Sequence, residues 1–188
     1  MHGAPARPLP VVLSSLATFT ALAALSVAPV AAAAQQRPAD PSLAALQASW
    51  RQAVDNLTQA AEDMPEADYA YRPVETVRTF GQMIGHVAGA QNAICAAVLG
   101  DPQPAEDAVE KAATTKAALV QALKASTAYC ARAYAIGAAT AGRQVQLFGQ
   151  RYTRVGALAL NAVHDGEHYG NIVTYLRTKG MVPPSSRR

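Results

Sequence analysis

The stretch NAVHDGEHYGNIVTYLRTKGMVPPSS, residues 161–186, decides the fold expected for this chain. Its apolar residues recur at helical intervals, and Gly180 followed by Pro183 stops the pattern, so we predict a helix from about Arg154 to Lys179. The middle of its apolar face is polar, with Asn161, His164, Asp165 and His168. Each unpaired polar group that a helix buries costs roughly 1–3 kcal/mol, so these side chains require a partner.

His164 and His168 lie four residues apart and are therefore neighbours on one helical face. A divalent metal would satisfy them, because neutral imidazole is a good ligand for zinc, nickel, copper or iron. Such a pair also arises by chance on exposed faces, and the spacing alone leaves that alternative open. The HDGEH sequence also matches the H-x-x-E-H motif of inverted zinc peptidases, but residues 169–188 hold no Asp or Glu to supply the further acidic ligand, so we reject that class.

A second predicted helix carries the third histidine, His86. The sequence Thr79-Phe-Gly-Gln82 is a capping box, and we expect the helix to run to Leu99 and stop at Gly100. Three glycines spaced by four residues on this helix leave a strip without side chains beside His86, along which another helix or a ligand could come close. They are Gly81, Gly85 and Gly89, and Gly166 with Gly170 is expected to do the same on the last helix.

Three imidazoles from two helices, His86, His164 and His168, predict one metal site with a position left for water, which is a catalytic rather than a closed structural arrangement. The fourth histidine, His2, lies in the first residues of the chain. Four side chains are candidates for contacts to the ligands or a substrate: Gln82, Asn161, Asp165 and Tyr169. Of these, Tyr169 also fits a plain core residue.

The rest of the chain predicts two more helices and an all-α fold. Leu and other apolar residues at helical spacing mark one helix over Ser42–Met64, and another begins near Thr115 and reaches Tyr134. Residues 100–114 form a long connection between the second and third helices. Residues 137–152 have no helical period and are open to brief strand pairing. Four helices of about 20 residues point to a four-helix bundle.

The first 34 residues are typical of a cleaved signal peptide. They hold one charged residue, Arg7, and an apolar core followed by an alanine run that offers a cleavage site after Ala33 or Ala34. We therefore expect the bundle domain, residues 35–188, to be periplasmic or secreted, without a stable membrane anchor. An uncleaved anchor is the alternative, because about 20 apolar residues can span a bilayer.

The overall charge does not indicate nucleic-acid binding. The chain has 188 residues, 16 Lys and Arg against 13 Asp and Glu, and a formal net charge of +3. Although the pI is near 9.0, the basic residues do not form a cluster. We expect no nucleic-acid partner.

The chain resembles the DinB/YfiT-like superfamily. The resemblance rests on FGQMIGHVAGAQ (80–91), TKAALVQALKASTAYC (115–130) and the 161–186 stretch. The family hallmark of one histidine on the second helix and H-x-x-x-H on the fourth matches His86, His164 and His168. The resemblance implies an up-down-down-up bundle, a bound divalent metal such as zinc or nickel, and frequent homodimers. It also implies, for some members, transfer or isomerisation chemistry with small thiols.

Cys95 and Cys130 are expected to form a disulfide if the chain is exported. Cys95 lies 16 residues after Thr79, and Cys130 lies 16 residues after Thr114. In antiparallel helices the two would be offset by on the order of 15 Å, beyond the roughly 7 Å limit between bridged Cα atoms. Parallel helices joined by the long connection bring them level. The alternative is two buried free thiols.

Two hypotheses for function follow from these residues. The first is an exported metal-dependent enzyme, a hydrolase or a thiol transferase, that acts on a small-molecule substrate or thiol at the three-histidine site. The second is a non-enzymatic bundle that binds a metal or small ligand. A metal-free bundle, in which Asn161 and Asp165 hydrogen-bond the histidines, is a third reading.

Overall fold

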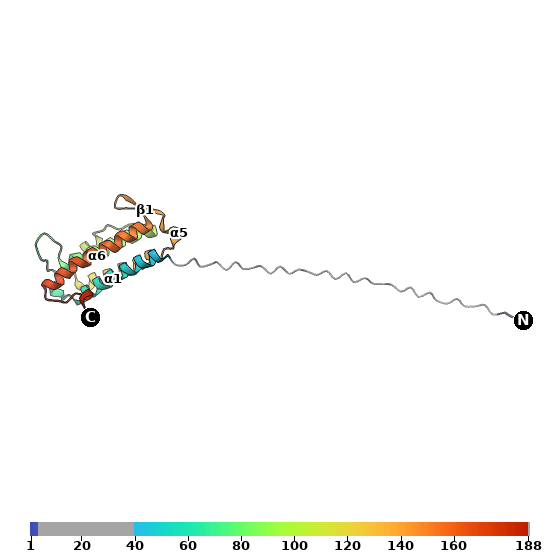
Figure 1. Cartoon of the computed structure of the whole chain (residues 1–188), viewed down its shortest axis with the longest axis horizontal. Helices are drawn as coiled ribbons and strands as arrows, with labels where there is room; N and C mark the ends of the chain where they lie inside the picture. The colour runs from blue at the N-terminus through green and yellow to red at the C-terminus, as the bar shows by residue number, and fades with distance from the viewer. Residues whose placement is uncertain (4–39, 188) are drawn as a thin grey trace. The chain divides into compact units, whose positions relative to one another are not determined.

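The computed structural model describes residues 1–3 and 40–187, so the predicted signal peptide lies almost entirely outside the described residues. The described chain is mostly helical (Figure 1). Its long helices are α1 (Pro41–Asp63), α2 (Phe80–Leu99), α4 (Lys116–Tyr134) and α6 (Arg154–Thr178). Short elements connect them: η1 (Glu66–Asp68), α3 (Ala108–Ala112), α5 (Ala138–Ala141), β1 (Gln144–Leu147), β2 (Gln150–Thr153) and η2 (Pro184–Ser186).

The helix ends follow from local sequence. At the start of α2 the Thr79 hydroxyl accepts from the Gln82 N–H at 3.2 Å, and the Gln82 side chain accepts from the Thr79 N–H at 2.8 Å. This is the predicted capping box, which satisfies two backbone donors that the first turn leaves free. The helix stops at Gly100, whose φ of 82° is a left-handed conformation that suits glycine.

Helices α2 and α4 run in the same direction. A disulfide joins Cys95 to Cys130 near their C-terminal ends, with 5.3 Å between the Cα atoms. Near their N-terminal ends, Leu119 of α4 lies against Gly81 and Gly85 of α2. The predicted disulfide is therefore present, and it joins the helix pair for which the sequence required a parallel arrangement.

Helix α6 runs opposite to α2. At one end, the Arg154 side chain donates to the Val98 carbonyl at 2.6 Å, and at the other the Tyr175 hydroxyl donates to the Arg78 carbonyl at 2.5 Å. These contacts hold the middle of α6 against the middle of α2. That is where the three histidines lie.

Helix α1 packs against α6 and α4. Its last turn meets the first turn of α4, because the Lys116 ammonium donates to the carbonyls of Glu62 and Met64 at 2.6 and 2.8 Å. Farther back, Trp50 stacks on Tyr134 at the end of α4, with 4.2 Å between ring centroids. Helices α1 and α4 are therefore antiparallel.

A small hairpin forms where the sequence left residues 137–152 open to brief strand pairing. Strands β1 and β2 pair antiparallel, with Val145 opposite Tyr152. Both turn residues, Phe148 and Gly149, have positive φ values of 49° and 75°, as tight two-residue hairpin turns require. Among the described residues, no helix is long and apolar enough to cross a membrane.

Candidate metal centre

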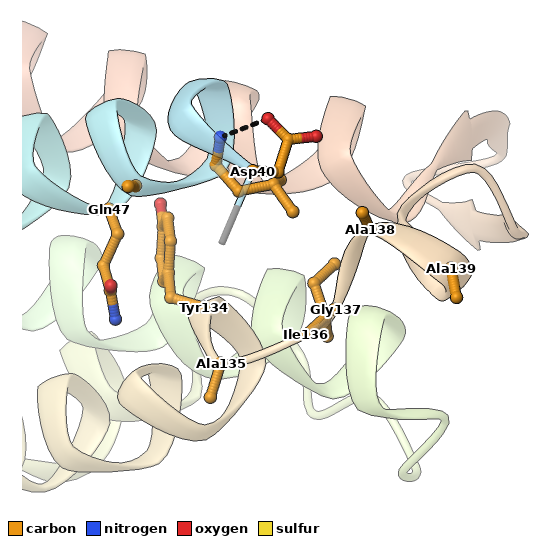
Figure 2. A pocket seen from close by; sticks show the side chains of 10 residues that line it. Asp40, Gln47, Tyr134, Ala135, Ile136, Gly137, Ala138 and Ala139 are labelled. Carbon is orange, nitrogen blue, oxygen red and sulfur yellow. Dashed lines mark hydrogen bonds between the residues drawn. The ribbon is translucent and has the colours of Figure 1, made fainter. Parts of the chain in front are cut away.

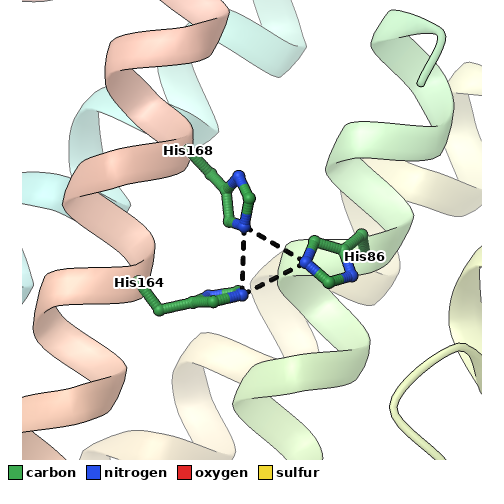
Figure 3. Close-up of side chains that lie close together, drawn as sticks. All are labelled: His86, His164 and His168. Carbon is green, nitrogen blue, oxygen red and sulfur yellow. Dashed lines mark hydrogen bonds between the residues drawn. The ribbon is translucent and has the colours of Figure 1, made fainter. Parts of the chain in front are cut away.

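The three predicted histidines converge between α2 and α6 (Figure 3). The Nε2 atoms of His86, His164 and His168 form a triangle with 3.1 Å along each side. His86 comes from α2, and the other two come from successive turns of α6. The sequence spacing therefore brings all three ring nitrogens to one point.

This triangle has the dimensions of a metal-binding face. Three nitrogens bound to zinc at about 2.0–2.1 Å in tetrahedral geometry lie about 3.3 Å apart, close to the separation found here. Among the described residues, these three side chains lie close enough together for each to offer one ligand atom to a single ion. Three protein ligands leave a fourth tetrahedral position for another donor.

Burial keeps the His86 and His168 rings neutral, which is the form of imidazole that binds metals. It lowers the pKa of His86 to about 4 and that of His168 to about 3, and electrostatic repulsion from the neighbouring Arg78 and His164 side chains adds to the lowering of both pKa values. Neutral imidazole offers a lone pair, whereas imidazolium offers none. These rings are therefore available as ligands at neutral pH without first losing a proton.

Each histidine has a polar group beside its other ring nitrogen. The Nδ1 atom of His86 lies 3.5 Å from a Glu106 carboxylate oxygen, and that of His164 lies 3.6 Å from an Asp165 carboxylate oxygen. Such carboxylates orient metal-binding imidazoles and raise their basicity. The sequence predicted Asp165 for this role but missed Glu106, which comes from the connection before α3.

Asn171 is the corresponding neighbour of His168, with its amide nitrogen 3.3 Å from Nδ1. An amide N–H can donate to Nδ1 only while the ring proton is on Nε2. Coordination through Nε2 moves that proton to Nδ1, and the amide must then turn to present its oxygen. Sequence reasoning missed Asn171, although its position three residues after His168 places it on the same helical face.

A buried polar network lies beneath His164. Asp165 and Asn161 are fully buried, and the Asn161 amide donates to an Asp165 oxygen at 3.2 Å and to the Tyr134 hydroxyl at 3.3 Å. Burial raises the pKa of Asp165 to about 6, against the opposing influence of N–H groups on His164, Trp50 and Asn161. Both predicted polar residues therefore support the His164 side of the cluster.

Two other predicted residues are engaged elsewhere. The Gln82 side-chain oxygen serves the capping box of α2. The Tyr169 hydroxyl donates to the Ser185 side chain and accepts from the Ser185 N–H, both at 2.8 Å, so it anchors the C-terminal segment on α6. Neither contact involves a histidine.

A separate pocket near one end of the helices does not contain the histidines. The pocket in Figure 2, about 400 Å³, lies at the start of α1 and the end of α4. Asp40, Gln47 and Tyr134 contribute to its wall, and Tyr134 connects it to the buried network through Asn161. The described lining of this pocket contains none of the three histidines.

The glycine strip on α2 admits the connection that carries Glu106. A Cβ atom at Gly85 would lie 2.8 Å from the Glu110 Cα, and one at Gly89 would overlap the Glu106 carbonyl oxygen. The predicted close approach is thus made by residues 106–110. The matching expectation for α6 is wrong, because a Cβ at Gly166 or Gly170 would meet no described atom within 4 Å.

Replacing Gly89 by alanine is expected to displace Glu106 and weaken the support of His86. We expect a loss of about 1–3 kcal/mol of stability, as for other overpacked sites. Urea unfolding measures this directly. Gly166→Ala is the matched control, because alanine in an exposed helix is better than glycine by up to about 1 kcal/mol. Equal stability changes in the two variants would contradict the assigned packing.

Asp165→Asn is expected to stabilise the metal-free protein at neutral pH and to weaken its metal binding. The folded pKa of about 6 exceeds the ordinary value of 3.8, so stability falls as pH rises from about 4 to 6 and the cost persists above. Removing the buried charge should add about 2–3 kcal/mol at pH 7.5. Metal affinity should fall about 10–100-fold.

Urea unfolding with a chelator at pH 7.5 and pH 4, together with zinc titration, tests this prediction. The stability gain of Asp165→Asn should shrink at the lower pH, where the wild-type carboxyl is protonated. A variant that is less stable than wild type at pH 7.5 without metal would contradict the assignment.

The DinB superfamily sequence profile matches residues 49–172, which include all three histidines and most of the four long helices. The chain therefore belongs to the DinB superfamily. No protein of curated function matches the sequence significantly.

Two solved structures share the fold. A DinB-like protein from Bacillus cereus is similar with a TM-score of 0.63 and 14% identity, over 74% of this chain and 93% of that chain. A mutant of a mycothiol-dependent maleylpyruvate isomerase is similar with a TM-score of 0.59 and 16% identity, over 78% of each chain. At these identities the likeness concerns the fold alone.

Proposed function

We propose that this protein is a metal-dependent enzyme that holds one divalent ion, zinc or nickel, on His86, His164 and His168. The observation that carries the proposal is the triangle of Nε2 atoms, 3.1 Å on each side, at the meeting point of two helices. Three neutral nitrogen ligands suit both metals. A bound ion would supply acidity to a water or thiol in the open position and polarise a substrate oxygen.

The protein's own residues prepare this site. The Glu106 and Asp165 carboxylates lie 3.5 and 3.6 Å from the outer nitrogens of His86 and His164, close enough to orient these rings once the outer nitrogens carry a proton. The Asn161 amide donates hydrogen bonds to the Asp165 carboxylate and to the Tyr134 hydroxyl, which connects Asp165 to Tyr134. Because these groups are in position before a ligand arrives, substrate binding need not reorganise them.

A small thiol is the co-substrate that we favour over water. The fold likeness to the mycothiol-dependent maleylpyruvate isomerase supports it, since that enzyme is thiol-dependent by name. We propose that the thiol adds to a small electrophilic substrate, and that the enzyme either transfers or isomerises that substrate. Metal-dependent hydrolysis is the alternative chemistry for the same site.

We further propose that the four long helices form an up-down-down-up bundle and that the protein acts in the periplasm or outside the cell. The parallel pair α2 and α4, the antiparallel pairs α2–α6 and α1–α4, and the intervening connection support this path. The disulfide between Cys95 and Cys130 supports an oxidising compartment. Mass spectrometry of the native N-terminus, expected near residue 35, tests export.

Paired assays separate an enzyme from a binding module. Protein purified without a histidine tag is loaded with zinc or nickel and assayed with thiol adducts and with simple esters. We expect about one metal per chain and turnover that His164→Ala abolishes. A variant that loses metal and melting temperature, while wild type shows no turnover on any substrate, would favour the non-enzymatic module. Less than about 0.2 metal per chain after loading would contradict both.

A further inference from the structure

A groove of about 290 Å³ lies beside the histidine cluster. Its floor includes Met83 of α2, three residues before His86 on the same helix. Its α6 wall includes Asn171, the residue whose amide contacts His168. The groove therefore lies next to the cluster, within one helical turn of it along both helices.

Uncharged side chains make up the groove's wall, as far as the described residues show. The loop before α2 contributes Pro73, Val74 and Val77, and both valines are exposed, at 56% and 38%. Tyr175 offers its ring rather than its hydroxyl, because the hydroxyl is bonded to the Arg78 carbonyl. No charged side chain among the described residues lines the groove itself, so a charged ligand group would lose its hydration there without an ionic partner in the wall.

The size of the groove limits its occupant. A cavity of about 150 Å³ holds benzene, and most sites for larger ligands exceed about 300 Å³. The volume here suits one aromatic ring with a short substituent, or a branched alkyl group of similar size. Met83 precedes His86 by less than one helical turn, about 5 Å along the axis, so a chain of about three or four bonds, the bond to the ion included, spans the gap.

We propose that this groove binds the apolar part of the substrate, a single aromatic ring or short branched alkyl group, with the reactive substituent directed at the histidine cluster. The inference rests on the proposed function, whose site it extends. Val74, Val77 and Met83 are specificity residues in this arrangement. Asn171 lies at the boundary, where it contacts a metal-binding ring on one side and the substrate on the other.

Methyl NMR of the purified protein tests the groove with two probes. Benzyl alcohol carries the ring, and phenylmethanethiol carries the same ring with a sulfur donor. We expect benzyl alcohol to shift the methyl signals of Val74, Val77 and Met83 saturably, with a Kd on the order of 1 mM, with or without zinc. With zinc, phenylmethanethiol should bind at least about 10-fold tighter than the alcohol, an advantage of about 1.4 kcal/mol.

Val77→Glu is expected to weaken benzyl alcohol binding at least about 10-fold, because it places a charge at the groove wall. Val182→Glu is the matched control, since Val182 is also exposed, at 59%, and lies outside the groove. The control should bind both probes as wild type does. Equal binding by the two variants would overturn the assignment of the groove.

The outcomes distinguish this inference from the proposed function. If zinc binds but benzyl alcohol causes no saturable shift up to about 20 mM, the groove assignment is wrong and the metal site stands. Groove signals that shift with protein concentration alone would make the occupant a second copy and overturn the substrate assignment. If zinc fails to bind while benzyl alcohol still shifts these methyls, the proposed function is overturned and the apolar binding site is supported.

Discussion

Replacing His86 by alanine is expected to reduce zinc affinity by more than about 100-fold, the upper end of what loss of an outer-shell partner costs. In the proposed site His86 is the ligand that α2 contributes, and the other two belong to one helix. Without it, His164 and His168 form an ordinary surface-type pair, which binds zinc weakly. Isothermal titration of the metal-free protein with zinc at pH 7.5 measures the loss.

Thermal unfolding provides a second measurement of zinc binding by His86→Ala. Zinc at 100 times its Kd stabilises a protein that binds it only when folded by about 2.7 kcal/mol. Wild type should therefore melt at a higher temperature with zinc, and His86→Ala should not. Asn171→Leu serves as the graded control, since it removes a partner of His168 and leaves all three ligands. An unchanged zinc response in His86→Ala would contradict the assigned ligand set.

Loss of the disulfide is expected to destabilise the protein by about 3–4 kcal/mol, the value for a closed loop of this length. Cys95 and Cys130 are 35 residues apart in sequence, so the bridge restricts a long segment of the unfolded chain. Both residues are fully buried. The double variant Cys95→Ala, Cys130→Ala should melt roughly 10 °C lower, because each 1 kcal/mol shifts a domain of this size by about 2–4 °C.

The double variant should retain zinc affinity within about three-fold, since the histidines lie on α2 and α6 and the bridge joins α2 to α4. Urea unfolding with and without a reductant measures the stability change. Wild type should respond to the reductant and the double variant should not. Zinc affinity that falls with the disulfide would show that the bridge positions the metal centre, which this structure does not predict.

Features that depend on near neighbours in the sequence could be predicted without the structure. The capping box of Thr79 and Gln82 and the stop at Gly100 are set within one helical turn. The convergence of His86 on the pair His164 and His168 could be predicted as well, because a buried polar face needs a partner. The helix caps depend on residues within one turn, and a buried polar face can be satisfied by only a few kinds of partner.

The contacts that the connections between helices make could not be predicted. Glu106 reaches His86 because the connection before α3 packs on the glycine strip, and no spacing in the sequence fixes that contact. Gly166 and Gly170 repeat the same spacing yet face open space. A periodic pattern shows that residues share a face, but only the packed neighbours decide whether that face is buried.

The buried Asp165 indicates that this fold gives up stability for its site. A carboxyl whose pKa is raised to about 6 by burial is costly to ionise at neutral pH. An apolar residue would stabilise the same position, as is common where a site requires a polar group. The position of the carboxylate beside His164 accounts for its presence there.

Zinc K-edge X-ray absorption of the zinc-loaded protein identifies the donor atoms around the ion. Coordination by the three histidines predicts three imidazole nitrogens at about 2.0–2.1 Å and one further light donor, with one imidazole signal lost in His86→Ala. A spectrum with oxygen donors alone, or one that is identical in wild type and His86→Ala, would contradict the claim that these three histidines hold one ion.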